Sequence, residues 1–171
     1  MRTIRLADLN EFDCDAFVTA LGHVIEGSPW VAERAHGQRP FADVEALHAA
    51  FCRALRAADA TAKRTVLNAH PDLAGKAAMA GELHGYSAAE QQGVGLDRLS
   101  AGEYAMFHEL NDAYRAKFGF PFVFAVKGAS KSMILQAFED RLPNDAATEF
   151  QRALGEVELI ARFRLEDLVS P

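Results

Sequence analysis

Apolar residues recur at helical spacing along most of the chain. Between residues 17 and 25 they fall on a single helix face at Phe17, Ala20, Leu21, Val24 and Ile25. Similar stripes predict helices near residues 47–58, 107–118, 134–138 and 150–168. The chain is therefore expected to be mostly helical, with polar residues on the outward faces.

Residues that favour helix ends lie beside these stripes. Gly27 is expected to end the first helix, and Ser28 followed by Pro29 is expected to begin the next one. Ser87 with Glu90, and Ser100 with Glu103, both have the spacing of a capping box at a helix start. Between residues 71 and 86, glycines punctuate the chain and Ala77, Ala78 and Ala80 allow only a brief helix.

One apolar stretch, at residues 118–126, does not follow helical spacing. It reads Phe-Gly-Phe-Pro-Phe-Val-Phe-Ala-Val and could form a buried strand, but no comparable run exists to pair with it. We therefore expect an extended, buried connector whose amides bond either to other protein groups or to a ligand. The predicted fold is all-α, a single-domain bundle of about eight helices over residues 1–171.

Composition narrows the class of function. The chain has 171 residues, 50% of them hydrophobic, and a formal net charge of −6, which argues against a general nucleic-acid binder. Cys14 and Cys52 form no CxxC pair, so neither a metal site nor a disulfide framework is expected. No apolar run is long enough for a membrane span and no signal peptide is evident, so a cytoplasmic protein with no membrane partner is expected.

His70 is the first candidate for chemistry. Because Pro71 disfavours the helical conformation at the preceding residue, a helix running up to His70 should stop there. Its imidazole would then lie beside helix-terminal carbonyls, which favour its charged form. Such a histidine suits proton transfer near neutral pH, but it can also simply cap a helix, and the motif alone leaves both readings open.

Two further positions are ambiguous on the same grounds. Arg164 lies within about 20° of Val157 around the last helix, at the centre of its apolar stripe. A buried guanidinium needs an anion, either one of the protein's own carboxylates or a substrate carboxylate. Glu90 can complete a simple capping box, which is the plainer interpretation, or form a small polar site with Ser87 and Gln91.

Taken in order, these motifs resemble a known family. His70-Pro71-Asp72-Leu73-Ala74, Ser87-x-x-Glu90-Gln91, Asn111-x-x-Tyr114 leading into residues 118–123, and Arg164-Leu165 are similar to the 2-oxo-4-hydroxy-4-carboxy-5-ureidoimidazoline (OHCU) decarboxylases of urate degradation. The resemblance spans nearly the whole chain. It implies an all-helical, cofactor-free homodimer that acts on a small molecule. The absence of a peroxisomal tail suggests a bacterial-type member.

The resemblance also implies roles for individual residues. His70 and Glu90 would be catalytic, and no metal would be bound. The residues expected to bind substrate, with Arg164 holding an anionic group, are Pro71, Ser87, Gln91, Phe122, Val123, Phe124 and Arg164. The residues do not decide which of His70 and Glu90 would deliver the final proton.

Two other functions fit parts of the pattern. A helical module could bind a small anionic heterocycle through Arg164 and the connector amides without turning it over. A metal-dependent hydrolase could use His70, Asp72 and other histidines, although their spacing does not support a metal site.

Overall fold

A computed structural model describes residues 3–75 and 85–171, which form two compact units. The first unit contains residues up to Ala69 together with Val157–Pro171, and the second contains His70–Glu156. The described residues form nine helices and two strands of two residues each, β1 (Ile4–Arg5) and β2 (Val169–Ser170). The all-α prediction is confirmed, whereas the assignment of residues 1–171 to a single domain stays a prediction.

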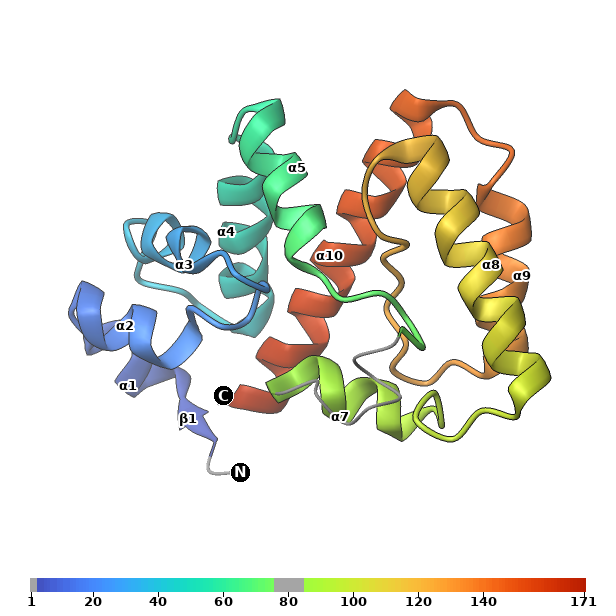
Figure 1. The fold of residues 1–171 in the computed structure, drawn as a ribbon. Coiled ribbons are helices and arrows are strands. Elements are labelled where there is room, and N and C mark those ends of the chain that lie inside the picture. The colour runs from blue at the N-terminus through green and yellow to red at the C-terminus, as the bar shows by residue number, and fades with distance from the viewer. Residues whose placement is uncertain (1–2, 76–84) are drawn as a thin grey trace. The chain divides into compact units, whose positions relative to one another are not determined.

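The first unit holds five complete helices and the end of a sixth (Figure 1). They are α1 (Leu6–Glu11), α2 (Cys14–Leu21), α3 (Pro29–His36), α4 (Val44–Arg56), α5 (Ala60–Ala69) and the last part of α10 (Ala146–Leu168). Asp13 caps α2 by accepting a 2.8 Å hydrogen bond from the Ala16 amide, and Asp43 caps α4 in the same way. The strands β1 and β2 pair in parallel, with Ile4 opposite Val169.

The predicted helix over residues 17–25 was too long. Helix α2 ends at Leu21. Val24 and Ile25 lie in the turns that follow it, and their side chains are buried. Gly27, at φ +58°, lies in the turn that leads to α3 rather than at the end of α2. Ser28 is the N-cap residue of α3, as expected, but its side chain makes no capping hydrogen bond.

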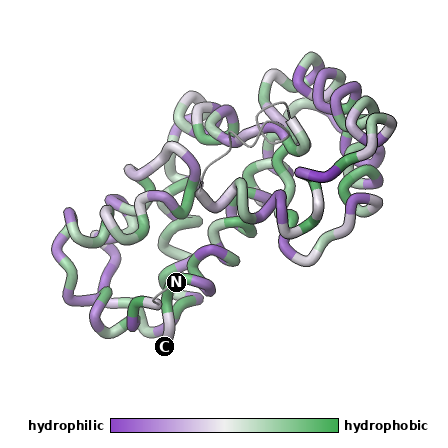
Figure 2. Tube along the Cα trace, turned by 60° about the horizontal axis from the view of Figure 1, so that its bottom comes forward, coloured by the Kyte–Doolittle hydropathy of each residue, from purple (hydrophilic) through white to green (hydrophobic). Residues whose placement is uncertain are grey.

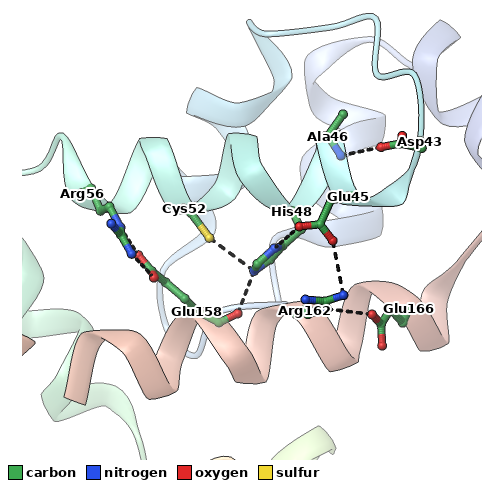
Figure 3. A network of polar contacts seen from close by, with 9 residues as sticks. All are labelled: Asp43, Glu45, Ala46, His48, Cys52, Arg56, Glu158, Arg162 and Glu166. Carbon is green, nitrogen blue, oxygen red and sulfur yellow. Dashed lines mark hydrogen bonds and ion pairs between the residues drawn. The ribbon is translucent and has the colours of Figure 1, made fainter. Parts of the chain in front are cut away.

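Polar side chains connect α4 to the end of α10 (Figure 3). Arg56 Nε and Nη2 donate to the two oxygens of the Glu158 carboxylate, at 2.5 and 2.6 Å, and His48 Nε2 lies 2.9 Å from the Glu158 carbonyl. Cys52 Sγ lies 3.2 Å from the same imidazole nitrogen. Since Arg56 is largely exposed, this pair contributes about 1 kcal/mol or less to stability.

The second unit contains α7 (Gly85–Gly93), α8 (Ala101–Phe118), α9 (Lys131–Arg141) and the first part of α10. The capping box at the start of α8 is confirmed, because Ser100 Oγ accepts from the Glu103 amide while Glu103 accepts from the Ser100 amide. Gly119 ends α8 in the left-handed conformation, at φ +75°. The brief helix expected near Ala77 lies outside the described residues.

The segment that follows Gly119 has no regular secondary structure up to Val126, as predicted. Its buried side chains join an aromatic core in which Phe122 stacks on Phe138, with ring centroids 3.6 Å apart. Tyr114 packs edge-on against both of these rings. The expected buried connector is therefore confirmed, and its aromatic side chains anchor it to α8 and α9.

Hydropathy alternates along the helices rather than forming long apolar stretches (Figure 2). Among the described residues, no helix combines the length and the apolar character that crossing a membrane requires.

The environment of Cys52 predicts low thiol reactivity. Burial, followed by the negative charge of Glu158, raises the pKa of the Cys52 thiol to about 11. Only about one thiol in a thousand is then ionised at pH 8, and the thiolate is the reactive form. In a Cys14→Ser variant, iodoacetamide alkylation should accelerate about tenfold per pH unit between pH 8 and 10. A rate that levels off near pH 8.5 would contradict this environment.

Candidate active site

His70 follows directly on the end of α5 at Ala69, as the sequence predicted. The residue is buried, with 6% of its surface exposed. The chain then turns through Asp72 to Gly75, where the Gly75 amide bonds to the Asp72 carbonyl at 3.3 Å. Pro71 and this turn thus fix the direction in which the chain leaves His70.

Within this turn, Ala74 adopts the left-handed conformation at φ +53°. This conformation costs a residue other than glycine about 1–2 kcal/mol. The Gln91 side chain offsets that cost, since its Oε1 accepts from the Ala74 amide at 3.0 Å and its Nε2 donates to the Asp72 carbonyl at 3.3 Å. The amide of this buried side chain thus satisfies two backbone groups of a turn in an unfavourable conformation.

Two side chains from α8 hold the same turn from another direction. Asn111 Nδ2 donates to the Leu73 carbonyl at 2.8 Å, and Arg115 donates to the Asp72 carboxylate at 2.7 Å. The two residues are four apart, so they lie on the same face of α8. Three consecutive residues after Pro71 thus each bond to a side chain of α7 or α8.

A cavity of about 420 Å³ opens beside this turn. The residues that line it are His70, Pro71, Asp72, Gly75, His108, Asn111, Asp112 and Arg115. Asn111 Oδ1 is buried here without a hydrogen-bond partner in the part of the chain that is described. The sequence signalled His70 and Pro71, but it gave no sign that Arg115 and His108 belong to the same cavity.

The expected capping box at Ser87 and Glu90 is wrong. Helix α7 already begins at Gly85, so Ser87, Glu90 and Gln91 all lie inside it. Ser87 and Gln91 are four residues apart and both buried, so they share its inward face, while Glu90 is only partly buried. Glu90 therefore does not cap the start of α7.

The connector contributes Phe122 and Val123, which are buried, and Phe124, which is partly exposed. The Val123 carbonyl accepts a hydrogen bond from Arg141 at 2.8 Å, and the Ala125 amide donates to Glu156 at 3.0 Å. The peptide groups on both sides of Phe124 are therefore fixed by side chains.

Arg164 belongs to the first unit, and 1% of its surface is exposed. Its predicted place on the buried face of α10 is therefore confirmed. Its Nη1 donates to the Val24 carbonyl at 3.2 Å and lies 3.4 Å from a Glu26 carboxylate oxygen. A carboxylate of the protein is thus nearby, but at a long distance for a charged pair. Burial, followed by the positive charge of Arg164, lowers the pKa of His23.

Most of the predicted site residues lie in the second unit, and the structure brings Gln91 onto the turn that follows His70. Among the described residues, no three or more histidine, cysteine or acidic side chains are grouped so as to hold a metal ion. The roles predicted for His70, Glu90 and the substrate-binding residues stay predictions at this point.

The sequence profile of OHCU decarboxylases matches residues 10–166. The chain belongs to the OHCU decarboxylase family. It is 44% identical over 171 residues to the enzyme of that name from Halalkalicoccus jeotgali, covering all of this chain and 95% of the relative. It is 43% identical to the Haloferax volcanii enzyme over 170 residues, covering 99% of each chain.

Some similar proteins are longer than this chain and align with it over only part of their length. The bifunctional uric acid degradation protein PucL of Bacillus subtilis is 41% identical over 163 residues, which cover 95% of this chain but 32% of PucL. A crystal structure of (S)-allantoin synthase aligns with a TM-score of 0.77 and 28% identity over 98% of this chain and 54% of that one. Relatives from archaea and from Bacillus leave the bacterial-type prediction undecided.

The two hydrogen bonds of Gln91 to the turn at Ala74 lead us to expect that Gln91→Met is less stable than the wild type. This change removes the acceptor for the buried Ala74 amide, which should cost about 1–3 kcal/mol in the free energy of unfolding. Gln92→Met is the matched control, because Gln92 is the exposed neighbour on the same helix and its replacement should change stability by less than about 0.5 kcal/mol. Urea denaturation of both variants measures the difference, and equal midpoints would argue against this role of Gln91.

Proposed function

We propose that this protein decarboxylates OHCU to (S)-allantoin in urate degradation. The observation that carries the proposal is 43–44% identity, over essentially the whole chain, to two OHCU decarboxylases. The buried His70, held by a clamped turn beside a cavity, supports the same activity.

The substrate itself supplies the electron sink for this reaction. Its carboxylate is attached to C4, next to the imine carbon C5. When the bond from C4 to the carboxylate breaks, carbon dioxide leaves and the electron pair forms a C4–C5 double bond while the imine nitrogen takes up a proton. Protonation at C5 and loss of the C4 hydroxyl proton then give a C4 carbonyl and a single stereocentre at C5. The protein has to orient the carboxylate and to move protons.

We assign these tasks to residues that the family motif and the geometry both favour. His70 is the proton carrier, because imidazole titrates near neutral pH and the turn after it is held by Gln91 and Asn111. Glu90 holds hydroxyl or ureido donors of the substrate. Arg164 holds the carboxylate, because the family resemblance implies a substrate-binding arginine at this position and its guanidinium is buried.

The remaining predicted contacts complete the proposed pocket. Pro71 and Ser87 shape it, and Gln91 Nε2 retains a second hydrogen beyond the one given to Asp72. Phe122, Val123 and Phe124 contribute backbone groups and ring faces. A homodimer and a cytoplasmic location are also part of the proposal.

The decisive experiment generates the substrate in place. Urate is oxidised and hydrolysed by the upstream enzymes, and the formation of optically active allantoin is followed by circular dichroism with and without this protein. Rapid appearance of one enantiomer only in its presence is expected. An unchanged, slow and racemic appearance of allantoin would reject the activity and favour a binding module.

His70→Asn should reduce turnover by about 10²–10⁴-fold, the usual contribution of a general acid or base. Asparagine keeps a polar group of similar size but cannot exchange a proton near pH 7. The initial rate of allantoin formation measures the effect, and a thermal melt confirms that the variant is folded. Retention of more than about a tenth of the wild-type kcat would mean that His70 is not the proton carrier.

Arg164→Met separates substrate binding from structural pairing. If Arg164 serves the substrate, its loss should change the unfolding free energy by about 1 kcal/mol or less and weaken allantoin binding by at least tenfold. If it serves structure, the loss of a buried pair should cost about 3–5 kcal/mol. Calorimetric titration and urea denaturation measure the two quantities.

The control is Arg162→Met on the same helix. Arg162 is exposed and pairs with Glu166 at 2.9 Å and with Glu45 at 3.4 Å, so its loss should affect neither quantity appreciably. A strongly destabilised Arg164→Met that still binds allantoin normally per folded molecule would contradict the assignment of Arg164 to the substrate.

A further inference from the structure

A fully buried ion pair lies under the connector in the second unit. Arg141 and Glu149 are 4% and 0% exposed, and Arg141 Nη2 lies 2.6 Å from Glu149 Oε1 while Arg141 Nε donates to the same oxygen at 2.8 Å. The Tyr114 hydroxyl also donates to this oxygen, and Asn144 donates to Glu149 Oε2 at 2.8 Å. The carboxylate is therefore saturated with donors.

This pair is unusual as a device for stability alone. Removing two charges from water is costly, and well-packed apolar side chains of similar volume often stabilise a core as well or better. The apolar surroundings already exist here, since the guanidinium lies 4.4 Å from the centroid of the Phe122 ring. Stability alone therefore does not explain why charged rather than apolar side chains occupy this place.

A further hydrogen bond of Arg141 indicates the role of these charges. Arg141 Nη1 donates to the carbonyl of Val123, in the middle of the connector, at 2.8 Å. Two residues further along, the Ala125 amide donates to Glu156 Oε2 at 3.0 Å, and Glu156 Oε1 pairs with Arg152 at 3.0 Å. Arg141 and Glu156 thus bond to the connector on either side of Phe124. Each of them is itself held by an ion pair.

These two bonds fix the direction of the peptide groups of Phe124. In a planar trans peptide the carbonyl and the amide point in opposite directions. Because the Val123 carbonyl faces Arg141, the Phe124 amide points away from Arg141, and because the Ala125 amide faces Glu156, the Phe124 carbonyl points away from Glu156. Phe124 thus carries one donor and one acceptor that face neither Arg141 nor Glu156.

We propose that Arg141, Glu149 and Glu156 are positioning residues that aim the amide and carbonyl of Phe124 at the amide edge of the substrate. Such an edge, with a ring N–H next to a ring carbonyl, is complementary to one donor and one acceptor side by side. Phe124 is the partly exposed member of a segment whose neighbours on both sides are buried. This proposal rests on the proposed decarboxylase function.

Helix α8 contacts both the Arg141–Glu149 pair and the turn after His70. Tyr114 bonds to Glu149, and Asn111, three residues earlier on the same face, bonds to the Leu73 carbonyl. The connector and the proton carrier's turn are thus both fixed to one rigid helix face.

The test replaces the charges without leaving one of them unpaired. An Arg141→Met/Glu149→Leu double variant should remain folded, because it leaves no buried charge unpaired and costs only the hydrogen-bond partners of Tyr114, Asn144 and the Val123 carbonyl. Its KM for OHCU and its Kd for allantoin should rise roughly 10- to 100-fold, the scale of losing oriented hydrogen bonds to a bound ligand. The pH dependence of kcat, which reports on the proton carrier, should stay unchanged.

Glu156 provides an independent pair of variants. Glu156→Gln keeps an oxygen that can accept from the Ala125 amide and should retain a KM near that of the wild type, whereas Glu156→Leu cannot and should raise the KM. The control is Arg56→Gln/Glu158→Gln, which removes an ion pair of the first unit and should leave the KM unchanged.

The outcomes separate this proposal from the activity itself. A wild-type protein that forms no optically active allantoin would reject the proposed function, regardless of these variants. If the wild type is active, a folded double variant with unaltered KM and Kd would overturn the positioning role and leave the pair structural. If the double variant does not fold, equal KM values for Glu156→Leu and the wild type would overturn it.

Discussion

The turn after His70 depends on the two hydrogen bonds of the Gln91 side chain. One accepts from Ala74, which would otherwise hold a buried amide in a left-handed conformation without a partner, and the other donates to Asp72. Asn111 and Arg115 add bonds to the same turn from α8. The role proposed for His70 requires a fixed position, and these contacts hold the three residues that follow Pro71.

Arg141 and Arg164, both buried in the described part of the chain, lie in different surroundings. Arg141 bonds to Glu149 at 2.6–2.8 Å and spends its remaining donors on Tyr114 and the Val123 carbonyl. Arg164 has its carboxylate, Glu26, at 3.4 Å. The first arrangement is a dense polar network in the second unit, whereas Arg164 lies in the first unit beside the Val24 carbonyl and the Glu26 carboxylate. In the proposed function, Arg141 positions the connector and Arg164 holds the substrate.

Sequence reasoning failed where local signals competed with tertiary packing. The apolar stripe at residues 17–25 looked like one helix, but burial of Val24 and Ile25 is achieved from turns after α2. Ser87 and Glu90 have the spacing of a helix start, yet α7 begins two residues before Ser87. In both cases the pattern predicted correctly which residues are buried or polar. It did not predict where the helix begins or ends.

The sequence by itself determined the all-helical fold, the end of α5 before Pro71, the buried face that holds Arg164, and the family. These follow from periodicity, from steric restriction beside proline, and from motifs that are contiguous in the chain. Only the tertiary structure decided that Gln91 and Asn111 clamp the turn after His70, and that Arg141 and Glu156 grip the connector. The partners in those bonds are 17 to 38 residues apart, and hydrogen bonds over such separations follow no period in the sequence, because they depend on how helices pack.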